Sequence, residues 1–122
     1  MANPIVPNIP ATIVALLAIG RLGAIHAVVF GGFAAPALVQ RIEACRPVAI
    51  LTTSASIDGT KPPIPFMPLV RTALISLQPE QRPSRVIVWD RKDEHYSLAA
   101  SKVLWSPLES SFGERSWQDL IS

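Results

Sequence analysis

The sequence predicts an α/β fold in three layers, with a mostly parallel sheet between flanking helices. Between residues 11 and 89, helical and strand-like segments alternate, which is the order of a parallel sheet with crossover helices. The predicted strands are apolar runs without polar alternation, as in strands buried on both faces. The chain has 122 residues, of which 49% are hydrophobic and 16% charged. This apolar share is large for one small domain, so we expect an incomplete part of a larger domain.

The first helix is predicted over Ala11–Leu22. Asn8 is a suitable N-cap, Pro10 is compatible with the first turn, and Gly23 is a suitable C-terminal stop. Apolar side chains occupy nearly every face of this segment, which predicts burial on most sides. It is nevertheless too short for a membrane span of about 20 apolar residues. The absence of Lys and Arg from Met1–Pro10 argues against a secretory signal.

The first strand is predicted over Ala24–Phe30, as an interior strand that ends at Gly31-Gly32. His26 lies inside this apolar run, and we interpret it as a core residue with a satisfied hydrogen bond. A second helix is predicted over Ala35–Arg46 and a second strand over Val48–Thr53, with Pro47 between them. The side of this helix expected to be apolar carries Leu38, Val39, Ile42 and Cys45.

The third helix and strand are predicted over Leu69–Leu77 and Arg85–Trp89. A loop, Ser54–Pro65, precedes them, and the polar segment Pro79–Ser84 connects them. Beyond Asp90 the pattern becomes irregular until a last helix begins, with Ser116 as its cap. Right-handed crossovers are expected between the parallel strands.

Composition excludes several classes of function. A net charge of +2 without a Lys/Arg run does not favour nucleic acid. The single cysteine, Cys45, fits a reducing compartment, and we interpret it as a small packed side chain. His26, His95 and Cys45 do not form a credible metal site, and no Ser-His-Asp arrangement follows from their spacing.

Two features admit a ligand. Gly31-Gly32 lies at the carboxyl end of a predicted strand, where parallel sheets bind ligands, although a plain strand-to-helix turn explains it equally. Lys61 follows Asp58-Gly59-Thr60 in the next loop. Its ammonium group could meet a phosphate, or it could be an ordinary exposed lysine.

A long stretch resembles one enzyme family. It includes Val6-Pro7-Asn8-Ile9-Pro10, Arg21-Leu22-Gly23-Ala24 and His26-Ala27-Val28-Val29-Phe30-Gly31-Gly32-Phe33. This pattern is similar to that of the AMP-forming acyl-CoA synthetases, and in particular to the acetyl- and propionyl-CoA synthetase branch. The likeness covers residues 5–90 well and residues 91–122 loosely.

The resemblance implies that residues 1–122 are a partial N-terminal adenylating domain of a short-chain carboxylate–CoA ligase. In such enzymes a carboxylate attacks the α-phosphate of ATP, with Mg²⁺ assisting, and the CoA thiol then displaces AMP. The family's phosphate loop, adenine and Mg²⁺ motifs and catalytic lysine do not occur in the sequence. We therefore expect no catalytic residue, no metal ligand and no activity of the chain alone.

The resemblance also implies one wall of a CoA site. Phe30, Gly31 and Gly32 match the residues that lie against the nucleotide end of CoA. Two basic positions of the family fall on Asp58 and Lys61, so that Lys61 keeps the charge and Asp58 reverses it. CoA and ATP are expected as substrates of the parent enzyme, and tight binding to this chain alone is not expected.

Alternatives remain open at this stage. The chain could be a small non-catalytic CoA- or nucleotide-binding module, or a truncated chain without function. We expect no nucleic-acid or membrane partner, and we expect the apolar faces to pack on the remainder of the parent domain. A cytoplasmic location is predicted, with the mitochondrial matrix as the alternative for the parent.

Overall fold

The fold is an α/β sandwich built on one parallel sheet. The computed structural model describes residues 2–5, 9–29, 34–56, 64–91 and 112–121. The sheet has the strand order β1-β2-β5-β6, and every neighbouring pair is parallel. Its strands are β1 (Ala2–Ile5), β2 (Ala49–Thr53), β5 (Arg85–Trp89) and β6 (Glu114–Ser116). The predicted fold class is therefore confirmed.

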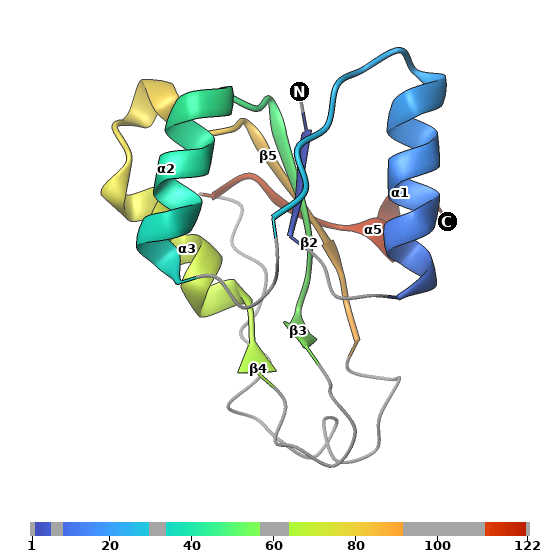
Figure 1. Cartoon of the computed structure of the whole chain (residues 1–122). Coiled ribbons are helices and arrows are strands. Elements are labelled where there is room, and N and C mark those ends of the chain that lie inside the picture. Colours follow the sequence, from blue (N-terminus) through green and yellow to red (C-terminus); the bar gives the residue numbers. More distant parts are fainter. Residues whose placement is uncertain (1, 6–8, 30–33, 57–63, 92–111, 122) are drawn as a thin grey trace.

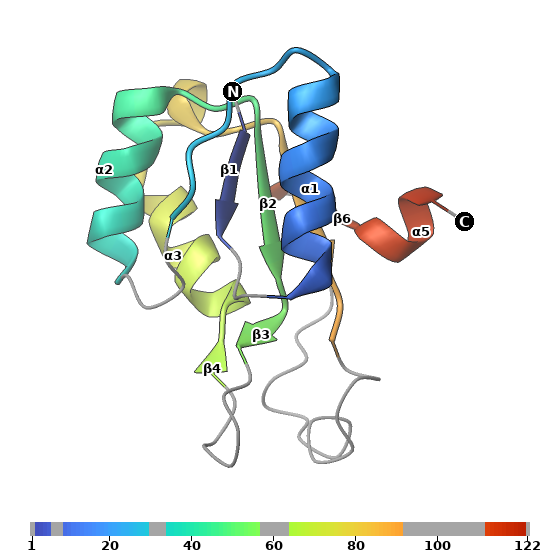
Figure 2. The ribbon, with the colours of Figure 1, turned by 45° about the vertical axis from the view of Figure 1, so that its right-hand side comes forward.

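Helices cover the two faces of the sheet unequally (Figure 1). One face carries α2 (Ala35–Cys45) and α3 (Met67–Ser76), which pack on each other, whereas α1 (Pro10–Arg21) lies over the other. The short helix α5 (Trp117–Ile121) lies on the same side as α1 in both views (Figures 1 and 2). This leaves less helical cover over the α1 face.

Local signals explain where the helices begin and end. Each of the three long helices has a proline in its first turn, where the missing N–H has no helical partner to lose: Pro10, Pro36 and Pro68. After α1, Gly23 adopts a positive φ of 71° and its amide donates to the Gly20 carbonyl at 3.0 Å. The Ala24 amide donates to the Ile19 carbonyl at 3.1 Å, which completes a Schellman motif. The predicted glycine stop is confirmed.

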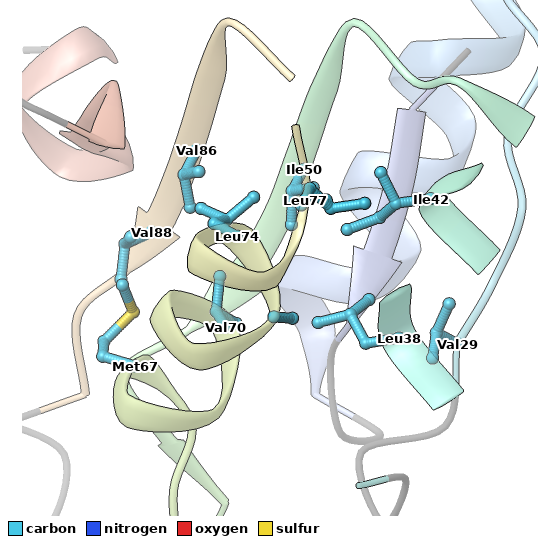
Figure 3. Close-up of a cluster of buried hydrophobic side chains, with 11 residues drawn as sticks. Val29, Leu38, Ile42, Ile50, Met67, Val70, Leu74, Leu77, Val86 and Val88 are labelled. Carbon is cyan, nitrogen blue, oxygen red and sulfur yellow. The ribbon is translucent and has the colours of Figure 1, made fainter. Parts of the chain in front are cut away.

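The hydrophobic core lies between the sheet and the α2–α3 layer (Figure 3). Along β5 the burial alternates, because successive side chains of a strand point to opposite faces. Val86 and Val88 point into the core and are buried, while Ile87 and Trp89 are only half-buried. The helices contribute the remaining large members of this cluster: Leu38, Ile42, Met67, Val70 and Leu74.

The predicted interior strand Ala24–Phe30 is wrong over its described part. Residues 24–29 make only isolated backbone bridges, at His26 and Val29, and run beside β1 in both views (Figures 1 and 2). Ile25 and Val28 are exposed, and only Val29 joins the core. The reason is positional. β1 pairs directly with β2, so the following segment lies outside it, and an apolar run alone does not reveal that order.

Three strands were not predicted. β1 contains Asn3 and Pro4, which strands generally avoid, although an edge strand tolerates proline. β6 is short and charged, and it lies in the part of the sequence without a clear pattern. Within the predicted loop Ser54–Pro65, β3 (Ala55–Ser56) and β4 (Ile64–Pro65) form a short antiparallel ribbon. All depend on pairing partners rather than on local propensity.

Single-residue expectations had mixed outcomes. His26 is exposed rather than buried in the core, because its segment lies at the sheet edge. Cys45 is half-buried on the side of α2 that carries Leu38 and Ile42. Ile9 occupies the N-cap position of α1 without a side-chain cap, and the predicted cap Asn8 lies outside the described residues.

Candidate functional site

The carboxyl edge of the sheet carries a connected set of buried polar groups. The Thr53 hydroxyl donates to the Ala55 carbonyl at 3.0 Å, and the Arg91 amide donates to the Ser54 hydroxyl at 2.9 Å. The Arg91 guanidinium also donates to the Ala55 carbonyl at 3.4 Å. Because Thr53 ends β2 and Arg91 follows β5, these bonds hold the ends of two central strands together. They give this edge a fixed geometry.

The β3–β4 ribbon extends from this edge (Figure 2). Ala55 pairs with Pro65 and Ser56 with Ile64, and the Phe66 amide donates to the Ser54 carbonyl at 3.0 Å. The chain between Ser56 and Ile64 therefore starts and returns at the carboxyl edge. Asp58 and Lys61 belong to that connection and lie outside the described residues.

The flanks of the second candidate segment reach the same edge. Val29 is buried beside Leu38 at the start of the core (Figure 3), and Ala34 is the N-cap of α2. Since α2 leads into the amino end of β2, its own first turn lies toward the carboxyl ends of the strands. Phe30, Gly31 and Gly32 lie between these flanks and outside the described residues. The flanks of both predicted ligand segments thus share one edge of the sheet.

An apolar recess lies on the α1 side of this edge. It has a volume of about 540 Å³ and is lined by Ile9, Pro10, Ala11, Val14, Trp89, Arg91 and Trp117. Trp89 and Trp117 meet edge to face, with ring centroids 5.3 Å apart and planes at 87°, a favourable aromatic geometry. Arg91 is the only charged side chain in this lining. Such a recess can bind apolar groups but offers no acid–base pair for catalysis.

The sequence did not indicate this recess, because its walls come from distant segments. Trp89 ends β5 and Trp117 begins α5, and they meet because β6 aligns in parallel beside β5. The side-chain amide of Gln118 adds to this connection: it donates to the Asp90 carbonyl at 2.9 Å and accepts from the Asp90 amide at 3.3 Å. The available signal was the predicted helix cap at Ser116, whose hydroxyl accepts from the Asp119 amide at 3.4 Å.

Two further searches covered the described part of the chain. It holds no group of three or more His, Cys, Asp or Glu side chains arranged to bind a metal ion. None of its helices combines the length and the apolar character needed to cross a membrane.

Comparison with known proteins identifies the class. Acetoacetyl-CoA synthetase from Streptomyces lividans has the same fold over 98% of this chain, with a TM-score of 0.68 and 23% sequence identity. The match covers 16% of that structure. The parallel sheet with its flanking helices is thus the architecture of one portion of an acyl-CoA synthetase. No family model matches the sequence.

Sequence relatives specify the branch. "Acyl-CoA synthetase short-chain family member B, mitochondrial" from Dictyostelium discoideum is 38% identical over 115 residues, which are 94% of this chain and 16% of that protein. Acetyl-coenzyme A synthetase from Leptospira biflexa is 46% identical over 56 residues, 46% of this chain and 9% of that protein. The chain is therefore homologous to a portion of the short-chain acyl-CoA and acetyl-CoA synthetases, and the expected family is confirmed.

Proposed function

We propose that this chain is part of the N-terminal adenylating domain of a short-chain carboxylate–CoA ligase of the acetate or propionate class. Its role there is to supply one wall of the CoA site, formed by Phe30, Gly31, Gly32 and Lys61. The observation that carries the proposal is the alignment with the Dictyostelium relative over 94% of the chain. The whole reaction, with ATP, Mg²⁺ and CoA, belongs to the longer protein. The cytoplasm or the mitochondrial matrix is the proposed compartment.

The fold supports a ligand wall at this position. Parallel α/β sheets bind ligands outside the carboxyl ends of their strands, and the described flanks of both candidate segments lie at that edge. Glycines at residues 31 and 32 permit close approach of a ligand to the backbone. The ammonium group of Lys61 suits a phosphate of CoA, whereas the carboxylate of Asp58 opposes one. We therefore expect weak rather than tight binding of CoA to this chain.

The first experiment measures catalysis. The purified 122-residue chain is assayed for ATP–pyrophosphate exchange with acetate and with propionate, and the full-length Dictyostelium relative serves as positive control. No exchange above background is expected, because the sequence lacks the phosphate loop and the catalytic lysine of the family. Robust exchange by the chain alone would refute the assignment of catalysis to the rest of the parent.

The second experiment measures the CoA wall. Calorimetric titration with CoA is compared for the chain, for Lys61→Glu and for the control Arg41→Glu. Arg41 is exposed on α2, so its reversal changes the net charge equally without touching the proposed wall. Weak binding that only Lys61→Glu abolishes supports the wall. Equal effects of both substitutions, or no binding at millimolar CoA, would contradict it.

The same titration tests the alternative of an autonomous binding module. The chain has its own closed core beneath α2 and α3, which favours independent folding of that half. Micromolar binding of CoA, sensitive to Lys61→Glu, would support a module that acts without the rest of a synthetase. We place this reading second because the α1 side lacks a comparable covering layer.

A further inference from the structure

The outer surface of α1 is apolar where a surface helix is normally polar. Its buried side is formed by Ala11, Ala15 and Ile19. The opposite side exposes Ile13, Val14 and Leu17, and Leu17 is 66% exposed. Arg21, in the last turn, is the only charged residue of the helix. A helix that is apolar all round is normally buried all round.

The α2–α3 side provides an internal comparison. The outward positions of α2 carry Gln40, Arg41 and Glu43, all exposed, and its inward positions carry the core residues Leu38 and Ile42. That is the ordinary pattern of a helix facing water. The two sides of one sheet therefore differ: one is finished for solvent, and the α1 side is not.

The sheet beneath α1 shows the same asymmetry. Ile50, Val86 and Val88 point toward α2 and α3 and are fully buried. Their alternates on the α1 face, Leu51 and Ile87, are only half-buried. The recess at Trp89 and Trp117 opens on this face too, with Val14 of α1 in its lining. Helix, sheet and recess together form one incompletely covered apolar surface.

From these observations we infer that the outer face of α1, together with the Trp89–Trp117 recess, is the docking surface for another segment of an acyl-CoA synthetase chain. The chain covers 16% of the matched structure while nearly all of its own fold is matched, so most of such a protein is available as the occupant. The occupant presents large apolar side chains, because the recess has one charged side chain and a volume of about 540 Å³. This inference rests on the proposed function.

The test supplies the occupant separately. The part of the Dictyostelium relative outside the aligned 115 residues is produced as its own polypeptide and titrated into the 122-residue chain. Binding is compared for Leu17→Glu and the control Ile75→Glu. Ile75 is 64% exposed, close to the 66% of Leu17, but lies on α3 across the sheet. We expect Leu17→Glu to weaken binding at least about tenfold and Ile75→Glu less than about twofold.

Other outcomes overturn the inference. Equal sensitivity to both substitutions, or no association, places the occupant elsewhere. Sedimentation of the chain alone tests a second copy as occupant: a dimer that Leu17→Glu dissociates and Ile75→Glu does not would replace the proposal, whereas a monomer supports it. Acyl-CoA formation by the mixture is scored separately. Binding through α1 without activity refutes the proposed function alone, and activity without the α1 dependence refutes the docking surface alone.

Discussion

Removal of the ion pair between α3 and β6 is expected to destabilise the chain strongly. The Arg71 Nε and Nη2 atoms each donate to one oxygen of the Glu114 carboxylate at 2.8 Å. The Glu114 side chain is 0% exposed and that of Arg71 is 12% exposed. Arg71→Met keeps most of the aliphatic stem and removes the charge, which deprives a buried carboxylate of its guanidinium partner.

The burial of the pair sets the magnitude. Loss of one partner of a buried pair costs about 3–5 kcal/mol, whereas loss of an exposed pair costs about 0–1 kcal/mol. Since small domains are stable by about 5–15 kcal/mol, Arg71→Met should remove a large part of the total. The double variant Arg71→Met/Glu114→Met should recover much of the loss, because no unpaired charge stays buried.

Urea unfolding followed by far-UV circular dichroism measures both effects through the midpoint and the slope. A loss below about 1 kcal/mol for Arg71→Met would mean that the pair behaves as a surface pair. A double variant no more stable than Arg71→Met would equally refute the reasoning, because the cost would then not come from the uncompensated carboxylate.

The remaining predictions concern packing and backbone conformation. Leu38→Ala, at 1% exposure in the core, should cost about 2–5 kcal/mol, while Leu22→Ala, at 83% exposure, should stay within about 0.5 kcal/mol; equal midpoints in urea would contradict this. Gly113 and Gly23 share a φ of 71°, but an added Cβ at Gly113 would meet the Ser84 carbonyl, whereas none meets an atom at Gly23. Gly23→Ala should therefore cost about 1–2 kcal/mol and Gly113→Ala clearly more. Thermal unfolding of the two variants decides the order.

Much of the secondary structure could be predicted because its signals are local. β5 coincides with the predicted strand Arg85–Trp89, and β2 lies within the predicted Val48–Thr53. Prolines in first turns and the glycine after α1 act within a few residues of the helix ends. The third helix begins two residues before the predicted Leu69 because Pro68 occupies its first turn.

The candidate site was less accessible to such reasoning. The sequence indicated a ligand edge at the carboxyl ends of the strands, and the flanks Val29, Ser56 and Ile64 agree with that edge. The predicted residues Phe30, Gly31, Gly32 and Lys61 remain predictions, because they lie outside the described residues. The recess beside Trp89 was not foreseen, since it requires contact between segments far apart in the chain.

By itself the sequence determined the types of most elements and the family of the chain, because propensity, helix stops and a specific motif are properties of neighbouring residues. Tertiary structure alone decided the order of the strands. It placed Ala2–Ile5 beside β2 and left residues 24–29 at the edge, with His26 exposed. It also decided that α1 keeps an uncovered apolar side, because burial depends on which other segments reach each face, and hydrophobic composition does not specify them.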